Sequence, residues 1–188
     1  MNTFAAVARS SRPNFLILTP VCIFPAVAAA YADGFRPEPI IVSLIVIAGV
    51  LAHAAVNLLN EWDDFRSGID LATQRTPFSG GSGALPAVPA AAAAVLVSGV
   101  LGLAVSAMIG LFLMSRSGLG LLIPGLVGLF LVVAYTAWIT RRPILCLIAP
   151  GLGFGPIMVA GSYYAITGSY SVAILWASLT PLLLGSGL

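Results

Sequence analysis

The chain is built from long, unbroken runs of apolar residues rich in Ala, Leu, Val and Gly. Hydrophobic residues make up 60% of it and charged residues only 7%, whereas a soluble domain carries about 25% charged residues. Such a chain cannot cover a water-soluble particle with polar groups, so lipid is its expected solvent. In lipid only helices and closed barrels satisfy every backbone polar group. Continuous runs, in place of short alternating strands, favour helices.

The apolar runs predict an all-α membrane protein with a single domain over residues 1–188. A spanning helix needs about 20 apolar residues. The six predicted spans are 14–32, 39–60, 88–114, 118–139, 144–166 and 171–187. The sixth is marginal in length. Prolines lie inside several spans, at Pro20, Pro25, Pro150 and Pro156, and we expect them to kink their helices.

The arginines predict the orientation of these spans, because short cytoplasmic loops carry an excess of basic residues. All eight basic residues are arginines. On one side of the membrane lie Arg9, Arg12, Arg66, Arg75, Arg141 and Arg142, and on the other Arg36 and Arg116. Both termini and the loops 61–87 and 140–143 are therefore expected in the cytoplasm. No basic patch interleaved with aromatic residues is present in the sequence, so nucleic-acid binding has no support.

The acidic residues are concentrated in one short segment. Of the six in the chain, four lie within ten positions: Glu61, Asp63, Asp64 and Asp70. Helical spacing places Asn57, Asn60, Glu61 and Asp64 on one face at the mouth of the second span. Gly68 is expected to end this helix and to let Asp70 turn back toward the same face. We interpret Asp63 as an ordinary solvated acid.

Carboxylates this close together repel one another unless a cation lies between them. Oxygen ligands of this kind suit Mg²⁺, which typically binds one or two carboxylates together with substrate phosphates. Ionisable groups at a membrane span are also usually functional. We therefore predict that this helix face, with Asp70 turned back toward it, binds Mg²⁺. The alternative interpretation is a solvated loop with surface acids.

Two further features lie near this segment. His53, one helical turn before Asn57, is interpreted as a hydrogen-bonded packing residue, the alternative being a residue that lines a cavity. The stretch 74–83 is rich in Gly and Ser, and its backbone N–H groups could cradle an anion. Arg75 within it could pair with a phosphate.

The acidic segment resembles the first aspartate-rich motif of the UbiA superfamily of intramembrane prenyltransferases, Asn-Asp-x-x-Asp followed by a further Asp. Asn60, Glu61 and Asp64 match its first three positions, with Glu61 in place of the usual Asp. Asp70 matches the branch in which the last acid follows six residues later. The stretch 74–83 resembles the loop of the branch that prenylates 1,4-dihydroxy-2-naphthoate in menaquinone synthesis. Residues 135–143 and 151–164 resemble the family's fourth-to-fifth-helix connection and its fifth helix.

This resemblance implies Mg²⁺-dependent transfer of a prenyl group from an isoprenoid diphosphate to an aromatic acceptor, nearest to the dihydroxynaphthoate branch. The Mg²⁺ ligands that it implies are Asn60, Glu61, Asp64 and Asp70, and among them the catalytic roles in holding the metal and diphosphate fall to Asp64 and Asp70. The residues expected at the diphosphate are Asn57, Asn60, Arg75, Ser79, Arg141 and Arg142. The last two arginines also serve as a topology signal in an alternative interpretation. The implied location is a prokaryotic inner membrane, with membrane lipid around the helices and the active-site loops in the cytoplasm.

The chain also departs from the family pattern. The family has nine membrane helices and a second acidic motif, Asp-x-x-x-Asp, after the sixth, whereas no acid follows Asp70 here. We expect a C-terminally truncated member that needs a second polypeptide to supply the remaining helices. Two other classes stay open: a non-catalytic isoprenoid- or quinone-binding membrane protein or helical subunit, and a small transporter. Transport is disfavoured because the last four spans contain no acid.

Overall fold

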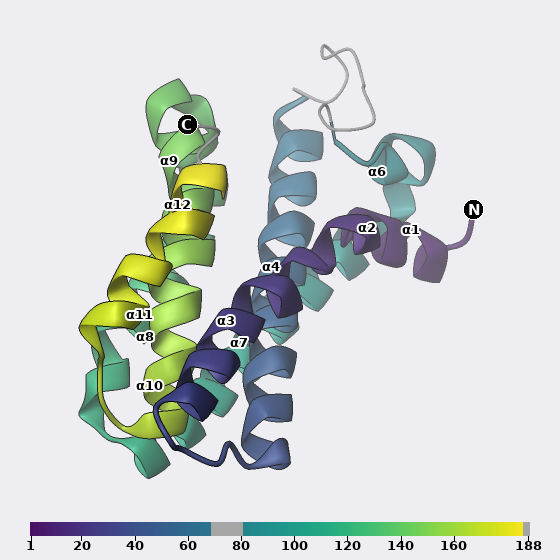
Figure 1. Ribbon diagram of the computed structural model, residues 1–188. Helices are drawn as coiled ribbons and strands as arrows, with labels where there is room; N and C mark the ends of the chain where they lie inside the picture. Colours follow the sequence, from purple (N-terminus) through teal and green to yellow (C-terminus); the bar gives the residue numbers. More distant parts are fainter. Residues whose placement is uncertain (69–80, 186–188) are drawn as a thin grey trace.

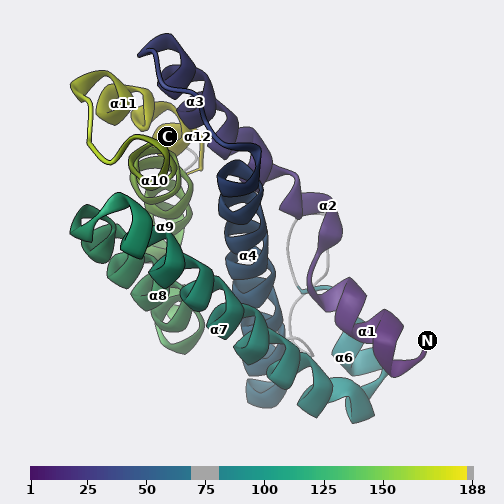
Figure 2. The same ribbon diagram turned by 90° about the horizontal axis from the view of Figure 1, so that it is seen from below.

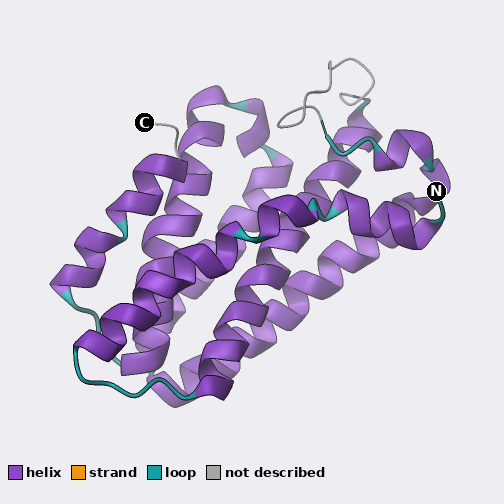
Figure 3. Cartoon of the chain, turned by 45° about the vertical axis from the view of Figure 1, so that its right-hand side comes forward, coloured by secondary structure: helices purple, strands orange, loops and turns teal. Residues whose placement is uncertain are grey.

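The computed structural model describes residues 1–68 and 81–185, and every element of regular secondary structure within them is helical (Figure 3). The α-helices are α1 (Thr3–Ser10), α2 (Pro13–Leu16), α3 (Leu18–Ala32), α4 (Pro39–Ser67), α6 (Ala84–Ala87), α7 (Ala92–Ser117), α8 (Leu122–Ala137), α9 (Pro143–Leu152), α10 (Gly161–Thr167), α11 (Val172–Ala177) and α12 (Leu179–Gly185). Short 3₁₀ helices connect some of them: η1 (Pro89–Ala91), η2 (Leu119–Leu121) and η3 (Ile139–Arg141). A π-helical segment, η4 (Gly153–Ala160), joins α9 to α10.

Five helical runs are long and apolar enough to cross a membrane: Thr3–Ala32, Pro39–Ser67, Pro89–Ser117, Leu119–Ala137 and Pro143–Thr167. A shorter apolar run, Val172–Leu183, follows them. The predicted all-α membrane fold is thus confirmed. The sixth predicted span is divided into α11 and α12, which meet at Ser178. Pro181 has no N–H to bond the carbonyl of Ala177, and this accounts for the break.

The first run differs from its prediction in extending further toward the N-terminus. Helix α1 precedes the predicted span 14–32, and the chain bends at Arg12, whose φ is 53°. Pro13 then begins α2. The bend places α1 against α4, α6 and α7, as seen beside the upper half of α4 in Figure 1.

Helix α4 occupies the centre of the bundle and contacts α3, α7 and α8 (Figure 2). Its contact with α7 is the most extensive between any two described elements. Small residues permit this close approach. A Cβ atom on Gly99 would lie 3.0 Å from the Leu59 side chain, and one on Gly102 would lie 3.5 Å from the Leu51 carbonyl oxygen.

The C-terminal half of α4 is held by a small apolar core. Its buried members are Ala6, Leu58, Ala84, Leu85, Ala91 and Val95. They come from α1, α4, α6, η1 and α7, and Trp62 and Phe65 of α4 pack against them. This core therefore fixes the helix end that carries the acidic segment.

Ion pairs define two ends of the bundle. At one end Asp63 of α4 lies 3.5 Å from Arg141, and Glu61 lies 3.8 Å from Arg12. At the other end Arg116, near the end of α7, pairs with Glu38 at 2.9 Å. Arg12 and Arg141, which the arginine count assigned to one side of the membrane, therefore lie at one end of the bundle, and Arg116 lies at the other.

Candidate active site

The acidic segment forms the last turns of α4. Asn57, Asn60, Glu61 and Asp64 all belong to this helix, and Gly68 caps it in the left-handed conformation with φ 76°. A glycine adopts that conformation without the steric cost of a Cβ atom. The predicted helix stop at Gly68 is confirmed.

Asn60 and Asp64 form a pair on one side of this helix end. The side-chain amide nitrogen of Asn60 donates to Asp64 Oδ2 at 2.8 Å, one turn away. Both residues are half-buried. The other amide atom of Asn60, Oδ1, is buried and has no hydrogen-bond partner among the described residues. A buried acceptor in this state is costly unless a donor or cation satisfies it.

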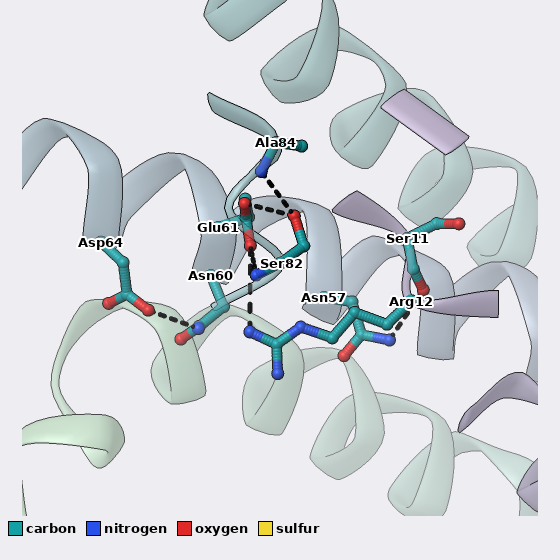
Figure 4. Close-up of polar contacts among 8 residues, drawn as sticks. All are labelled: Ser11, Arg12, Asn57, Asn60, Glu61, Asp64, Ser82 and Ala84. Atoms are coloured by element: carbon teal, nitrogen blue, oxygen red, sulfur yellow. Dashed lines mark hydrogen bonds and ion pairs between the residues drawn. The ribbon is translucent and has the colours of Figure 1, made fainter. Parts of the chain in front are cut away.

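Glu61 points elsewhere and is completely buried. The backbone N–H of Ser82 donates to its Oε2 at 2.8 Å, and the Ser82 hydroxyl donates to Oε1 at 2.5 Å (Figure 4). A guanidinium nitrogen of Arg12 lies 3.8 Å from Oε2. Glu61 thus links α4 to the turn before α6 and to the bend before α2.

The N-terminal bend contributes to this site, which the sequence did not suggest. The side-chain amide of Asn57 donates to the carbonyl oxygen of Ser11 at 3.0 Å, and Arg12 reaches Glu61 as described. Figure 4 shows Arg12 extended between Asn57 and Glu61. Arg12 had been interpreted only as a topology signal. Its role depends on a bend that brings residue 12 back to the end of α4, and the one local signal for that bend was Pro13.

Asp63 does not lie in solvent, so the prediction for this residue was wrong. It is 7% exposed. Its two carboxylate oxygens lie 3.4 Å from Arg66 and 3.5 Å from Arg141. Helical spacing correctly separated Asp63 from the other acids, but it could not show that Arg141, from the connection between α8 and α9, reaches this carboxylate.

The adjacent arginines of that connection have different surroundings. Arg141 pairs with Asp63, while the Arg142 guanidinium lies 5.7 Å from the centre of the Trp138 ring, within cation–π distance. Arg141 stays about half exposed, at 56% of its side chain. Their predicted contact with a diphosphate stays a prediction.

Comparison with known families finds that a model of the UbiA prenyltransferase family matches residues 20–188. The chain belongs to this family. The match covers the acidic segment, the connection with Arg141 and the π-helical segment, so the resemblance drawn from the motifs is confirmed at family level. Searches of curated proteins and of solved structures returned no match.

The UbiA family is a family of prenyltransferases acting on aromatic acceptors, and its members generally use Mg²⁺. Three predicted site residues of this UbiA chain, Asp70, Arg75 and Ser79, lie outside the described residues. Within residues 1–68 and 81–185, no group of three or more His, Cys, Asp or Glu side chains converges as a metal site.

The side-chain oxygen atoms of Asn60 and Asp64 suit a magnesium ion. Asn60 offers a buried oxygen without a partner, and Asp64 offers a half-buried carboxylate one turn away. Mg²⁺ prefers oxygen ligands and is commonly held by one or two protein groups together with substrate phosphates. The Asn60–Asp64 pair therefore fits the metal that the family uses.

His53 lies deeper in the UbiA bundle, where the structure supports its interpretation as a hydrogen-bonded packing residue. Its Nδ1 lies 3.0 Å from the Thr19 hydroxyl. The Phe154 ring of η4 packs on it edge-to-face, with ring centroids 4.9 Å apart. The π-helical segment thus supplies one wall of the histidine's environment.

Two cavities lie away from the acidic segment. A polar cavity of about 220 Å³ at the opposite end of the bundle is lined by Arg36, Glu38 and Arg116 among others. An apolar cavity of about 170 Å³ lies between α8 and α9. Neither is lined by Asn60, Glu61 or Asp64, so polar contacts define the candidate site.

Proposed function

We propose that this UbiA-family chain transfers a prenyl group, in a Mg²⁺-dependent reaction, from an isoprenoid diphosphate to 1,4-dihydroxy-2-naphthoate in menaquinone synthesis. The observation that carries the donor half of this proposal is the Asn60–Asp64 pair with its unsatisfied buried oxygen. The acceptor half is supported by the resemblance of residues 74–83 to the dihydroxynaphthoate branch.

The reaction breaks the bond between the allylic carbon of the donor and a diphosphate oxygen, and the diphosphate leaves with the electron pair. The electron-rich ring supplies the pair for the new carbon–carbon bond and then gives up a proton or its carboxyl group from the attacked carbon. A bound metal ion would neutralise charge on the leaving diphosphate. Asn60 and Asp64 would hold that metal, with Asp70 as a further predicted ligand.

Other residues act on the diphosphate and on the surroundings of the reaction in this proposal. Diphosphate oxygens would be bound by three arginines, Arg75, Arg141 and Arg142, since a guanidinium group can bind them in a bidentate manner. The hydroxyl of Ser79 would donate to the same diphosphate. Asn57, near the same helix end, would also bind the diphosphate. The lipid-embedded helices keep water away from the allylic cation.

We further propose that the end of the bundle carrying Asp64 faces the cytoplasm of a prokaryotic inner membrane. The excess of arginines among the connections at this end supports that orientation. The charged diphosphate head group of the donor would then lie at the cytoplasmic end of the bundle, while its prenyl chain lies among the helices and the membrane lipid.

The proposed function can be tested by a turnover assay on membranes that contain the chain. Radiolabelled geranyl, farnesyl and geranylgeranyl diphosphates are offered with 1,4-dihydroxy-2-naphthoate or 4-hydroxybenzoate, with Mg²⁺ or with a chelator. A prenylated naphthol that forms only with Mg²⁺ is the expected result. Prenylation of 4-hydroxybenzoate alone would show that 1,4-dihydroxy-2-naphthoate is not the acceptor. Binding of the donor without any product would indicate a non-catalytic isoprenoid-binding protein.

A further inference from the structure

The Glu61 carboxylate offers no open side to a ligand. The residue is 0% exposed, and donors from Ser82 and the cation of Arg12 surround its oxygens. Mg²⁺ gives up its hydration water reluctantly and keeps several waters when bound to protein. A hydrated metal would have to displace the Ser82 donors to reach this carboxylate.

The neighbouring pair has the opposite character. Asn60 and Asp64 are half-buried, and Oδ1 of Asn60 lacks a partner within the described part of the chain. Figure 4 shows Glu61 directed toward Ser82, while Asp64 and Asn60 are directed toward each other on another side of the helix. Glu61 and the Asn60–Asp64 pair therefore have different surroundings, although all three residues lie within two turns of α4.

We propose that Glu61 is a positioning residue, which holds Arg12 and the Ser82 turn beside the Asn60–Asp64 pair and does not ligate the metal. This inference rests on the proposed function, because it assigns a role within the donor site. It departs from the prediction, based on the motif, that Glu61 is a metal ligand.

Arg12 is the residue through which Glu61 would act on the donor. Its φ of 53° makes it the single non-glycine residue with positive φ among the described residues. A conformation of this kind persists only where surrounding contacts maintain it. Asn57 supplies one such contact through the Ser11 carbonyl, and Glu61 supplies another through the guanidinium group.

The Arg12 guanidinium also retains an unused donor. Its Nε is buried and has no hydrogen-bond partner in the described ranges 1–68 and 81–185. A phosphate oxygen is a suitable acceptor for it. Glu61 would thus keep a second cationic group, besides the metal, at the diphosphate.

Ser82 provides the other half of the arrangement. Besides donating to Glu61, its hydroxyl oxygen accepts from the backbone N–H of Ala84, the first residue of α6, at 3.1 Å. The Glu61 carboxylate therefore fixes the chain where it enters α6. Loss of the carboxylate should release both the turn and Arg12.

A binding experiment separates a positioning role from a metal ligand. The purified full chain is titrated with geranylgeranyl diphosphate and with Mg²⁺, as wild type and as Glu61→Gln, Arg12→Gln and Asp64→Asn. Glu38→Gln serves as a matched control, because that carboxylate pairs with an arginine at the opposite end of the bundle. The Mg²⁺ titration is run with the donor at tenfold above the Kd of each variant.

We expect Glu61→Gln to weaken donor binding about tenfold, as for a lost charge-assisted contact. Combining it with Arg12→Gln should add little to the effect of Arg12→Gln alone. The Mg²⁺ concentration at half-saturation should stay within about threefold of wild type for Glu61→Gln but rise more than about tenfold for Asp64→Asn. A rise for Glu61→Gln as large as that for Asp64→Asn would overturn the proposal.

A stability experiment tests the Glu61–Ser82 contact without any ligand. Glu61→Gln and Ser82→Ala should each lower the melting temperature in detergent by about 5 °C, and the double variant should lower it by much less than the sum. Additive shifts would show that the two residues do not act together. If the wild type binds no prenyl diphosphate, the proposed function fails, whereas this measurement still decides whether Glu61 holds the turn.

Discussion

Asp63 and Arg141 lie 78 positions apart in the chain, yet a carboxylate oxygen of Asp63 is 3.5 Å from a guanidinium nitrogen of Arg141. The pair joins the end of α4 to the connection between α8 and α9. It thereby places the two arginines of that connection near the acidic helix end. Because Asp63 is buried, the pair has a structural role that neither residue was expected to have.

Removing the Asp63 charge should destabilise the protein. Asp63→Asn removes the buried carboxylate that Arg66 and Arg141 share, and we expect a loss of about 1.5–3 kcal/mol in the free energy of unfolding, the range for hydrogen bonds to charged groups. Thermal unfolding in detergent measures the loss. The exchanged pair Asp63→Arg with Arg141→Asp should recover part of it. Glu38→Gln, which breaks an exposed pair, should cost less than about 1 kcal/mol, and an equal cost for both would show that the Asp63 pair has no special weight.

Gly155 should be intolerant of any side chain. A Cβ atom there would lie 2.6 Å from the Ser178 carbonyl oxygen and 2.8 Å from the Leu182 backbone nitrogen, and backbone cannot move aside cheaply. We expect Gly155→Ala to cost about 1–3 kcal/mol of stability.

Gly110→Ala is the matched control for this substitution, since nothing lies within 4 Å of its Cβ position in α7. It should be neutral or stabilising by about 0.5–1 kcal/mol, because alanine favours a helix over glycine. Equal melting temperatures for the two variants would contradict the close packing of η4 against α12.

His53 should contribute to stability and little to donor binding. Thr19 is buried, so His53→Ala leaves its hydroxyl without the 3.0 Å contact. We expect a loss of about 1–2 kcal/mol in the free energy of unfolding, as found for hydrogen bonds between model membrane helices. Adding Thr19→Val to His53→Ala should cause no further loss, because the same hydrogen bond is already broken. Weakened donor binding at unchanged melting temperature would favour the alternative, in which His53 lines the substrate cavity.

The proposed orientation predicts which end of the bundle can be labelled from outside the cell. Single cysteines are placed at exposed Glu38 or exposed Arg66 in a chain whose Cys22 and Cys146 are replaced by alanine. An impermeant maleimide applied to intact cells should label position 38 and not position 66. The reverse pattern would place the site on the outer face.

The helices and their ends were largely predictable from sequence, because continuous apolar runs and a glycine such as Gly68 act locally. Helical spacing also located the acidic face of α4. What covers each side of that helix could not be predicted. One partner of Glu61, Ser82, lies 21 positions downstream. The other, Arg12, lies far upstream, at the bend before α2. Asp63 is likewise paired with Arg141, 78 positions away in the chain. Such contacts arise from tertiary packing and leave no periodic signal.

In the proposed function, the Asn60–Asp64 pair at the end of α4 holds the metal and diphosphate of an isoprenoid donor. The most direct test is equilibrium binding of geranylgeranyl diphosphate to the purified chain, with and without Mg²⁺, for wild type, Asp64→Asn and Asp33→Asn. Asp33 provides the control because it bonds Tyr163 and not the acidic segment. We predict Mg²⁺-dependent binding that Asp64→Asn weakens by more than about tenfold and that Asp33→Asn leaves unchanged. Binding by Asp64→Asn equal to that of wild type would show that Asp64 does not hold the metal or the diphosphate.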